Sequence, residues 1–492
     1  MILEQFFART LLQDDYSEPR AQFLMQLMEV SRQGHLCWKT SEISPVSIAS
    51  LNGAVVQDGD RYYLRRNWDL ETKILAEVSR LSATLNHSDY DEERFLVLLE
   101  QSPLLAGQRE VVHHALKRRF ALICGGPGTG KTFTAAQLVK LLAASCKKER
   151  YKVALSAPTG KAAMHLHAGI MTIPGVDFEA QTIHRLLRLS PGEYRLSSKR
   201  KIDADLVIVD EASMIDVVLL AQLLDATPSD TRLILLGDPD QLPPVEAGSL
   251  FAEMAELFGL FLKESKRTSC LKLQRCAQMV NRGEFDFDGM YRQDLALDAS
   301  LAKRLFEIMQ PICFWQEPNP EECLANLHRL RVLGALRQGP FGIDALNQQI
   351  VQEAGRHIRP GQWWVIPIMV TTNDIRQELY NGTCGVLIGK SRGGVFLQDG
   401  TAYFPQTVPY AALPPYEVAF CLSIHKSQGS EFDHVIALLP PGSESFGKEA
   451  LYTAVTRAKH QVEIVGQEDT LREMLSKRSR KVSGFTERYT RS

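Results

Sequence analysis

Eight consecutive residues offer the clearest chemistry in this chain, Gly-Gly-Pro-Gly-Thr-Gly-Lys-Thr at positions 125–132. The apolar run 120–124 precedes them and a helix-like segment, 133–143, follows. A glycine-rich loop between a strand and a helix can wrap its backbone N–H groups around phosphates, with the lysine on the β and γ oxygens and the threonine hydroxyl on Mg²⁺. The predicted nucleotide-binding residues are Gly125, Gly126, Pro127, Gly128, Thr129, Gly130, Lys131 and Thr132. The pattern therefore predicts a site for ATP with Mg²⁺, the alternative being a plain glycine-rich turn.

Apolar runs predict the sheet that must position this loop. The runs 120–124, 152–156, 205–209 and 232–236 are separated by helical stretches, which is typical of a parallel sheet covered on both faces. Ligands bind such sheets at the carboxyl ends of the strands.

Two of these strand ends carry residues suited to hydrolysis. After 205–209 come Asp210, predicted to hold Mg²⁺, and Glu211, predicted to orient and deprotonate the attacking water. Capping of the next helix is the alternative for this pair. After 232–236 comes Gln241, which is placed to sense the γ-phosphate, and the nearby prolines would stiffen that connection.

Other positions near the loop give weaker indications. Gln108, upstream of the loop, could offer its amide to an adenine edge. The strand end at 157–161, Ala-Pro-Thr-Gly-Lys, suits a nucleic-acid backbone, although a plain turn fits as well.

The second half of the chain has no phosphate loop but predicts a second α/β layer. Its expected strands are 331–336, 366–371, 417–422, 434–438 and 461–465. This half contributes Arg267 and Arg457, and an arginine brought to a γ-phosphate from a separate domain would make hydrolysis depend on domain closure. A surface salt bridge is the alternative for either arginine.

We therefore expect an α/β protein of three units. They are an N-terminal domain at 1–100, an α/β domain with the phosphate loop at 101–262, and a second α/β domain at 263–492. Turn signals predict a hairpin at 54–64, a small β-barrel insertion at about 380–414 and a protruding hairpin at 188–201.

The amino-acid composition excludes only a few classes of protein. The 492 residues are 45% hydrophobic and 23% charged, with a net charge of −2, so any nucleic-acid site must be a local groove. The nine cysteines form no Cys-x-x-Cys pair and have no histidines at ligand spacing, which argues against zinc and disulfides and suits a reducing cytoplasm. Glu4 and Arg9 exclude a signal peptide, and no run approaches the ~20 apolar residues of a membrane span.

The motifs, taken in order, resemble those of superfamily 1 DNA helicases, and within them the RecD family, the alpha subunits of exodeoxyribonuclease V. The resemblance covers most of residues 100 to 480. Its motifs are the loop at 125–132, Ala-Pro-Thr-Gly-Lys-Ala-Ala (157–163), Thr-Ile-His-Arg-Leu-Leu (182–187), Val-Asp-Glu-Ala-Ser-Met-Ile-Asp (209–216), Gly-Asp-Pro-Asp-Gln-Leu-Pro-Pro-Val (237–245), Ala-Leu-Arg-Gln-Gly-Pro-Phe-Gly (335–342), His-Lys-Ser-Gln-Gly-Ser-Glu-Phe-Asp (425–433) and Tyr-Thr-Ala-Val-Thr-Arg-Ala-Lys (452–459).

This resemblance implies an architecture and an activity. The architecture is two RecA-like P-loop motor domains with an SH3-like β-barrel insertion, and a mainly helical N-terminal domain that docks partners through a segment similar to 59–68. The activity is ATP-dependent 5′ to 3′ DNA unwinding within a RecBCD-type complex that acts on double-strand DNA ends in recombinational repair. The implied partners are single-stranded DNA, duplex DNA ends and RecB-like and RecC-like subunits, with the nuclease in a partner subunit.

The resemblance also implies roles for individual residues. Arg267 and Arg457 become arginine fingers, Gln108 the adenine contact and Glu431 a ribose contact. One departure is Lys266, which stands where the family usually has tyrosine. The positions that fall in DNA-contacting segments of relatives are Thr159, Lys161, His184, Asn373, Ser423 and His425.

Three other functions stay open at this point. The first is a RecD-like helicase that works without partners, although its N-terminal extension is usually longer than the ~100 residues expected for a single small domain here. The second is a motor-shaped subunit that bridges partners and does not need hydrolysis. The third is translocation along RNA, because residues that bind the backbone and bases of a single strand can bind either DNA or RNA.

Overall fold

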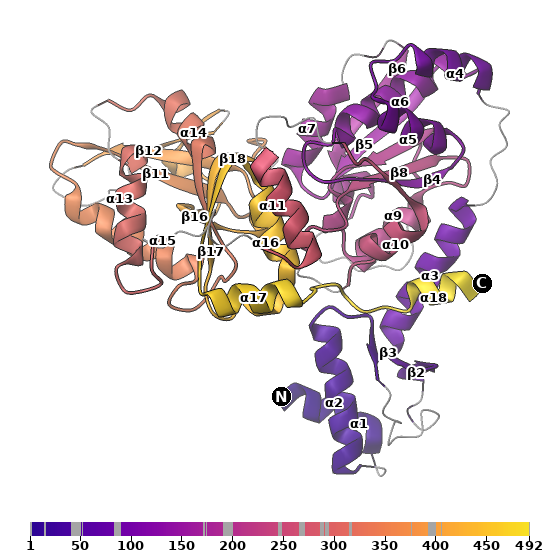
Figure 1. The fold of residues 1–492 in the computed structure, drawn as a ribbon, viewed down its shortest axis with the longest axis horizontal. Coiled ribbons are helices and arrows are strands. Elements are labelled where there is room, and N and C mark those ends of the chain that lie inside the picture. The colour runs from indigo at the N-terminus through magenta and orange to yellow at the C-terminus, as the bar shows by residue number, and fades with distance from the viewer. Residues whose placement is uncertain are drawn as a thin grey trace.

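The protein has two lobes side by side, with a smaller N-terminal unit next to the first lobe (Figure 1). The ribbon is a computed structural model. It describes residues 2–13, 16–40, 51, 53–82, 90–170, 173, 175–189, 200–244, 248–264, 271–285, 290, 295–313, 317–374, 376–391, 400–404 and 406–491. The predicted hairpin at 188–201 falls mostly outside these residues.

The first lobe is built on a six-stranded parallel sheet with strand order β6-β5-β7-β8-β4-β9. Four of the strands confirm the predicted apolar runs, whereas β6 and β9 were not predicted. The strands are β4 (Phe120–Cys124), β5 (Tyr151–Ala157), β6 (Val176–Thr182), β7 (Leu206–Val209), β8 (Arg232–Gly237) and β9 (Gly259–Phe261). The helices around them are α4 (Glu92–Glu100), α5 (Ala106–Leu116), α6 (Lys131–Ser145), α7 (Gly160–Ile170), α8 (Ile183–Leu186), α9 (Val217–Ala226) and α10 (Phe251–Phe258).

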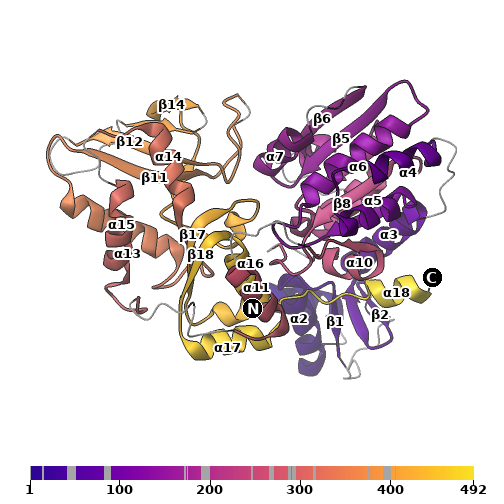
Figure 2. The same cartoon turned by 45° about the horizontal axis from the view of Figure 1, so that its top comes forward.

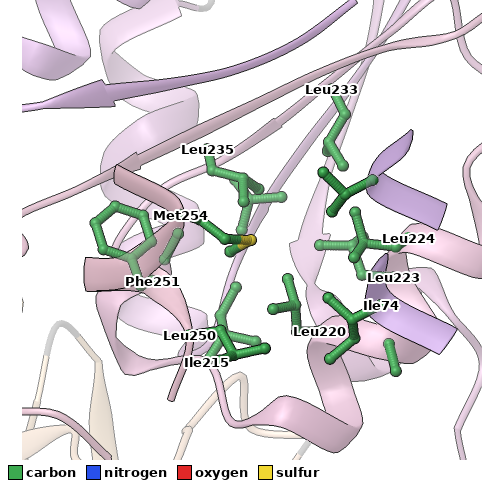
Figure 3. Packing of buried hydrophobic residues seen from close by; sticks show 14 of the residues in the cluster. Ile74, Ile215, Leu220, Leu223, Leu224, Leu233, Leu235, Leu250, Phe251 and Met254 are labelled. Carbon is green, nitrogen blue, oxygen red and sulfur yellow. The ribbon is translucent and has the colours of Figure 1, made fainter. Parts of the chain in front are cut away.

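Both faces of this sheet are covered around its central strands, which explains why β4 and β7 are apolar without alternation, whereas the edge strand β6 is partly polar. Leu233 and Leu235 of β8 point into one buried cluster, while Ile234 and Leu236 point into the other. Figure 3 shows the first cluster, in which side chains of β8, α9 and α10 meet Ile74. Because successive strand residues face opposite sides, a strand buried on both sides must be apolar throughout.

The second lobe contains a four-stranded parallel sheet with order β16-β10-β17-β18. Its strands are β10 (Leu330–Gly334), β16 (Cys421–Ser423), β17 (Phe432–Leu439) and β18 (Ala458–Gly466). The helices of this lobe are α11 (Leu271–Arg282), α13 (Leu301–Cys313), α14 (Pro320–Arg329), α15 (Ile343–His357), α16 (Gly447–Thr456) and α17 (Glu468–Ser476).

A five-stranded antiparallel sheet is attached to the parallel one, with order β14-β13-β12-β11-β15. The expectation that 366–371 joins the parallel sheet was wrong, because that run lies in β11 and pairs antiparallel with β12 and β15. The expected strand 417–422 is in fact two strands in two different sheets. The antiparallel strands are β11 (Trp363–Val370), β12 (Cys384–Lys390), β13 (Thr401–Tyr403), β14 (Thr407–Pro409) and β15 (Tyr416–Val418).

The N-terminal unit combines helices with a small antiparallel sheet of order β1-β3-β2. The predicted hairpin at 54–64 is confirmed by β2 and β3. The elements are α1 (Ile2–Leu12), α2 (Glu18–Arg32), β1 (Cys37–Lys39), β2 (Val55–Asp58), β3 (Arg61–Leu64) and α3 (Arg65–Ser82). Ile74 and Val78 of α3 are buried in the core of the first lobe, so this helix belongs to both units.

The end of the chain crosses back from the second lobe to the first lobe and the N-terminal unit (Figure 1). We call residues 477–491, which include α18 (Phe485–Arg491), the C-terminal strap. The Val482 carbonyl accepts the N–H of Leu36 at 2.9 Å, and Phe485 is fully buried. Arg488 lies 3.6 Å from the centre of the Trp68 ring and donates to Glu71 at 2.9 Å. The strap therefore links all three units.

Candidate functional site

The glycine-rich loop connects β4 to α6 as the sequence predicts. Gly128 and Gly130 have φ values of 76° and 81°, a left-handed backbone that side chains other than glycine rarely adopt. Gly130 precedes the first turn of α6, whose free N–H groups point toward the loop. The Lys131 ammonium lies inside the loop and donates to the carbonyls of Gly125 and Gly126, at 2.7 and 3.3 Å. Loop and helix thus form the anion-binding geometry that the motif predicts.

The two predicted Mg²⁺ ligands lie together at the start of α6. The Thr132 hydroxyl donates to a carboxylate oxygen of Asp210 at 3.2 Å, and Asp210 is buried at the end of β7. A hydroxyl and a carboxylate are the oxygen ligands that Mg²⁺ takes in nucleotide sites. No other cluster of metal-binding side chains occurs within the part of the chain that the structure describes.

Glu211, the predicted general base, has an uncommon backbone conformation and a raised pKa. It has a φ of 51°, an uncommon value for a residue other than glycine, which turns the chain sharply after Asp210. Burial and the neighbouring Asp210 carboxylate raise the pKa of Glu211, while Arg457 and Lys131 oppose that rise. A carboxylate with a raised pKa accepts a proton more readily, as the predicted role requires.

Arg457, the second-lobe arginine, is buried at the end of α16 and donates to the Ser430 carbonyl at 3.2 Å. Its Nε has no partner among the described residues, and its charge acts on Glu211. Glu431 adjoins Ser430 and precedes β17, so its segment lies beside the same arginine. The other predicted arginine, Arg267, and its neighbour Lys266 lie outside the described residues.

Gln241 forms a hydrogen bond with another side chain of its own segment, that of Asp238. Its amide nitrogen donates to Asp238 at 3.3 Å, and its amide oxygen is buried without a partner in the described structure. Asp238 also accepts a hydrogen bond of 3.0 Å from the Tyr452 hydroxyl of α16, and burial raises its pKa. Leu242 N–H donates to the Thr453 hydroxyl at 2.8 Å, so the Gln241 segment is bound to α16 at two points.

Sequence reasoning missed Asp238, Tyr452 and Thr453. All three lie in motifs that the sequence contains in recognisable form, but only Gln241 and Arg457 were assigned roles within them. A useful signal was available for Asp238, because a carboxylate directly after a fully apolar strand is buried and needs donors. Which donors it finds depends on the second lobe.

Gln108 binds backbone groups on both sides of its side chain. Its amide oxygen accepts the Leu105 N–H at 3.2 Å, and its amide nitrogen donates to the Thr129 carbonyl at 3.2 Å. The side chain therefore caps α5 and fixes the loop, and its contact with adenine stays a prediction. A cavity of about 540 Å³ lies beside it, between α5 and residues 259–264.

A second cavity, of about 360 Å³, lies between the lobes beside the loop. Gly125, Gly126 and Thr129 line it from the first lobe, and α11 and α16 line it from the second. This second cavity adjoins the glycine-rich loop and is lined by both lobes, whereas the first is lined by α5 and residues 259–264.

The predicted DNA-contacting residues follow the ends of strands. Thr159 comes after β5 and His184 after β6, while Ser423 is the last residue of β16 and His425 follows that strand. Asn373 follows β11, and the Lys161 side chain lies outside the described residues. Burial lowers the pKa of His425 to about 4, with the Lys481 charge adding to the effect. The imidazole is therefore neutral at physiological pH and can contact a strand only through hydrogen bonds or its ring.

Comparison with known proteins shows the family of this chain. A family model described as an AAA domain matches residues 108–247, and a UvrD-like helicase C-terminal domain matches 418–465. The RecBCD enzyme subunit RecD of Mycolicibacterium smegmatis is 34% identical over 469 residues, which cover 87% of this chain and 82% of that protein. The chain belongs to the RecD family.

Other proteins are also similar to this chain. The RecBCD enzyme subunit RecD of Haemophilus influenzae is 29% identical, covering 86% of this chain and 79% of that protein. The ATP-dependent RecD2 DNA helicase of Deinococcus radiodurans is 31% identical over 81% of this chain but only 54% of its own length. A crystal structure of Pif1 helicase from Candida albicans aligns with 79% of this chain and 99% of that one, at 19% identity and a TM-score of 0.47. As a helicase of the RecD family, the chain is an enzyme that uses ATP.

Proposed function

We propose that this chain is an ATP-hydrolysing DNA helicase that moves 5′ to 3′ along one strand. In this proposal it works as the RecD-type subunit of a RecBCD-type complex in the cytoplasm and acts on double-strand DNA ends during recombinational repair. Its partners are RecB-like and RecC-like subunits, and the nuclease resides in a partner. Its relatives support the assignment, since those of similar length are named RecBCD enzyme subunit RecD.

The observation that carries the proposal is the position of Arg457. It comes from the second lobe and binds the Ser430 carbonyl, while a Cβ atom at the adjacent Gly429 would lie 3.9 Å from the Glu211 carboxylate of the first lobe. An arginine supplied by another domain stabilises the charge that develops on the γ-phosphate. Hydrolysis would then require the lobes to close, which couples ATP turnover to movement of one lobe relative to the other.

Each side chain of the site has a role in this mechanism. Lys131 and the loop N–H groups hold the phosphates, and Thr132 and Asp210 hold Mg²⁺, which neutralises phosphate charge when bound. Glu211 accepts the proton of the attacking water, and Gln241 senses the γ-phosphate. Arg267 serves as a second arginine finger, Gln108 contacts adenine and Glu431 contacts ribose.

We further propose where the strand binds and what the remaining parts do. Thr159, Lys161, His184, Asn373, Ser423 and His425 line the groove for single-stranded DNA. The antiparallel sheet β11–β15 would be the SH3-like barrel of the second motor domain, and the hairpin at 188–201 would split the duplex. Residues 1–100 would dock the partner subunits.

The experiment compares the wild type with Lys131→Gln in a DNA-stimulated ATPase assay, with and without co-expressed RecB-like and RecC-like subunits. Wild-type protein should hydrolyse ATP and unwind a duplex with a 5′ tail, and Lys131→Gln should do neither. Lys152→Gln is the matched control, because Lys152 forms an exposed ion pair with Asp203 at 2.8 Å, away from the loop. Wild-type protein without activity in either setting would refute the proposal, and efficient unwinding by the monomer alone would favour a partner-independent helicase.

A further inference from the structure

The ring of Tyr380 bridges the two lobes at a point that the proposed mechanism does not use. Tyr380 lies in the connection between β11 and β12 of the second lobe, whereas Gly160 is the first residue of α7 in the first lobe. A Cβ atom at Gly160 would lie 2.5 Å from Cγ of Tyr380 and less than 3 Å from two more ring carbons. The ring therefore packs directly on the glycine backbone, where any side chain would displace it.

This contact lies between two segments that we assign to the DNA groove. Thr159 precedes Gly160, and its hydroxyl accepts the Ala162 N–H at the start of α7. On the other side, Asn373 accepts the N–H of Asn381, the residue after Tyr380, at 2.8 Å. Figure 2 shows α7 on the side of the first lobe that faces the second. The Tyr380 ring therefore reaches from one side of the proposed DNA groove to the other, instead of lying along one side of it.

The connection that carries Tyr380 has a fixed backbone. Asp374 and Leu379 exchange two backbone hydrogen bonds, of 2.7 and 3.0 Å, and Glu378 between them has a φ of 53°. The Thr383 N–H donates to the Tyr380 carbonyl at 2.9 Å. A non-glycine residue keeps a left-handed backbone only where its surroundings impose it. The fold therefore presents this ring in a defined place.

The Tyr380 ring is partly exposed, and it belongs to none of the hydrophobic clusters formed by the described residues. A flat aromatic surface beside a groove that holds a single strand suits a nucleobase, because every base has a π face that can stack on it. A base can offer the ring a larger contact area than one glycine does.

We propose that Tyr380 stacks on one base of the bound strand and that this base takes the place of Gly160 against the ring. The inference rests on the proposed function, since it requires a strand in the groove. It adds to that function a contact that depends on both lobes, because the ring and the glycine it leaves belong to different ones. Stacking on this ring holds the strand to the second lobe.

The experiment uses single-stranded oligonucleotides with 2-aminopurine at successive positions, and full-length wild-type, Tyr380→Phe, Tyr380→Leu and Tyr380→Ala proteins. The fluorescence of 2-aminopurine falls when the base stacks on an aromatic ring. We expect quenching at one position with wild-type protein and with Tyr380→Phe, and its loss with Tyr380→Leu and Tyr380→Ala. Affinity for the unmodified oligonucleotide should fall about tenfold in Tyr380→Ala, as for the loss of one base–aromatic stack.

Tyr380→Leu separates stacking from packing, since leucine can still cover Gly160 but has no π face. If all four proteins give the same quenching and affinity, the inference is wrong although the proposed function stands. If the wild type binds no single strand and its ATPase does not respond to DNA, the proposed function itself fails. DNA-independent ATPase activity and thermal unfolding of each variant show whether the fold is intact.

Discussion

The Tyr452 hydroxyl donates a hydrogen bond of 3.0 Å to the Asp238 carboxylate, and the two residues belong to different lobes. Both side chains are buried, and burial raises the pKa of each. The same carboxylate accepts from Gln241 at 3.3 Å. The segment that we expect to sense the γ-phosphate is therefore bound to α16, the helix that ends at Arg457.

Tyr452→Phe should weaken the link between the lobes without changing their packing. The loss of a donor to a buried carboxylate costs about 1–3 kcal/mol, and Asp238 keeps its other partners, so we expect the lower half of that range. The free energy of unfolding in urea measures this, and DNA-stimulated ATPase should fall as well. Tyr416→Phe is the control, since the hydroxyl of Tyr416 in β15 donates to the Tyr410 hydroxyl at 3.5 Å within the second lobe. Equal ATPase in wild type and Tyr452→Phe would show that this bond does not transmit the nucleotide state.

Glu211→Gln should stop hydrolysis while ATP still binds. The amide keeps the shape of the side chain but cannot accept the proton of the attacking water, so we expect a loss of about 10²–10⁴-fold in kcat. Single-turnover hydrolysis and binding of a fluorescent ATP analogue test the two halves of this prediction. Glu431→Gln provides a matched substitution in the second lobe, and it should change nucleotide affinity more than kcat. Full activity of Glu211→Gln in an assembled complex would instead favour a subunit whose hydrolysis is dispensable.

Glu253 should make stability depend on pH near neutrality. Burial, helped by the nearby Glu71, raises the pKa of Glu253 from 4.5 to about 7, although Ser483 of the strap donates to it. The folded protein therefore binds this proton more tightly than the unfolded chain does, and stability falls as pH rises from about 4.5 to 7. Glu253→Gln removes the titration, so its Tm relative to wild type should be higher at pH 8 than at pH 5.

The control for this experiment is Glu256→Gln, one turn further along α10, where the carboxylate pairs with Arg480 at 2.6 Å on the surface. Thermal unfolding between pH 5 and pH 8 compares the three proteins. A constant difference in Tm between Glu253→Gln and wild type over this range would show that the Glu253 proton is not linked to folding.

Phe485→Ala should release the strap from the first lobe. The ring is fully buried and stacks near Tyr489, so its truncation should cost about 3–5 kcal/mol. Limited proteolysis should then cleave the strap faster, and amide exchange should rise in β1, whose first N–H is near the Val482 carbonyl. Val482→Ala, where the side chain is exposed, should leave the strap in place. Unchanged exchange in β1 of Phe485→Ala would mean that the other contacts of the strap hold it in place without the Phe485 ring.

Local pattern predicted the parts of the site that lie within one segment. Strand β4, the loop and α6 follow from an apolar run, glycines and a helical stretch, and Asp210 and Glu211 follow from their place after β7. The strand 366–371 was assigned to the wrong sheet for a physical reason. Trp364 and Val365 of β11 pack into different hydrophobic clusters, so this antiparallel strand is buried on both faces and is as apolar as a parallel one.

What the sequence could not predict are the contacts between distant segments. The Gln108 amide binds the backbone of Leu105 and Thr129, two partners that its place in the sequence does not indicate, and its contact with adenine stays a prediction. The bond from Tyr452 to Asp238 joins residues 214 positions apart, and no local pattern specifies such a pair. Packing of Tyr380 on Gly160 likewise depends on how the lobes are placed, which propensity and periodicity do not encode.

The C-terminal strap also bears on how the chain is made. Arg61 donates to the Ser483 carbonyl, and these two residues are 422 positions apart. The N-terminal unit is synthesised first, yet its contacts with Val482, Phe485 and Arg488 form only when the last residues of the chain are available. Domains usually fold in the order of their synthesis. Here the N-terminal unit is completed by the strap, which is synthesised about 400 residues later, so a partner that binds this completed surface would not bind a chain that lacks the strap.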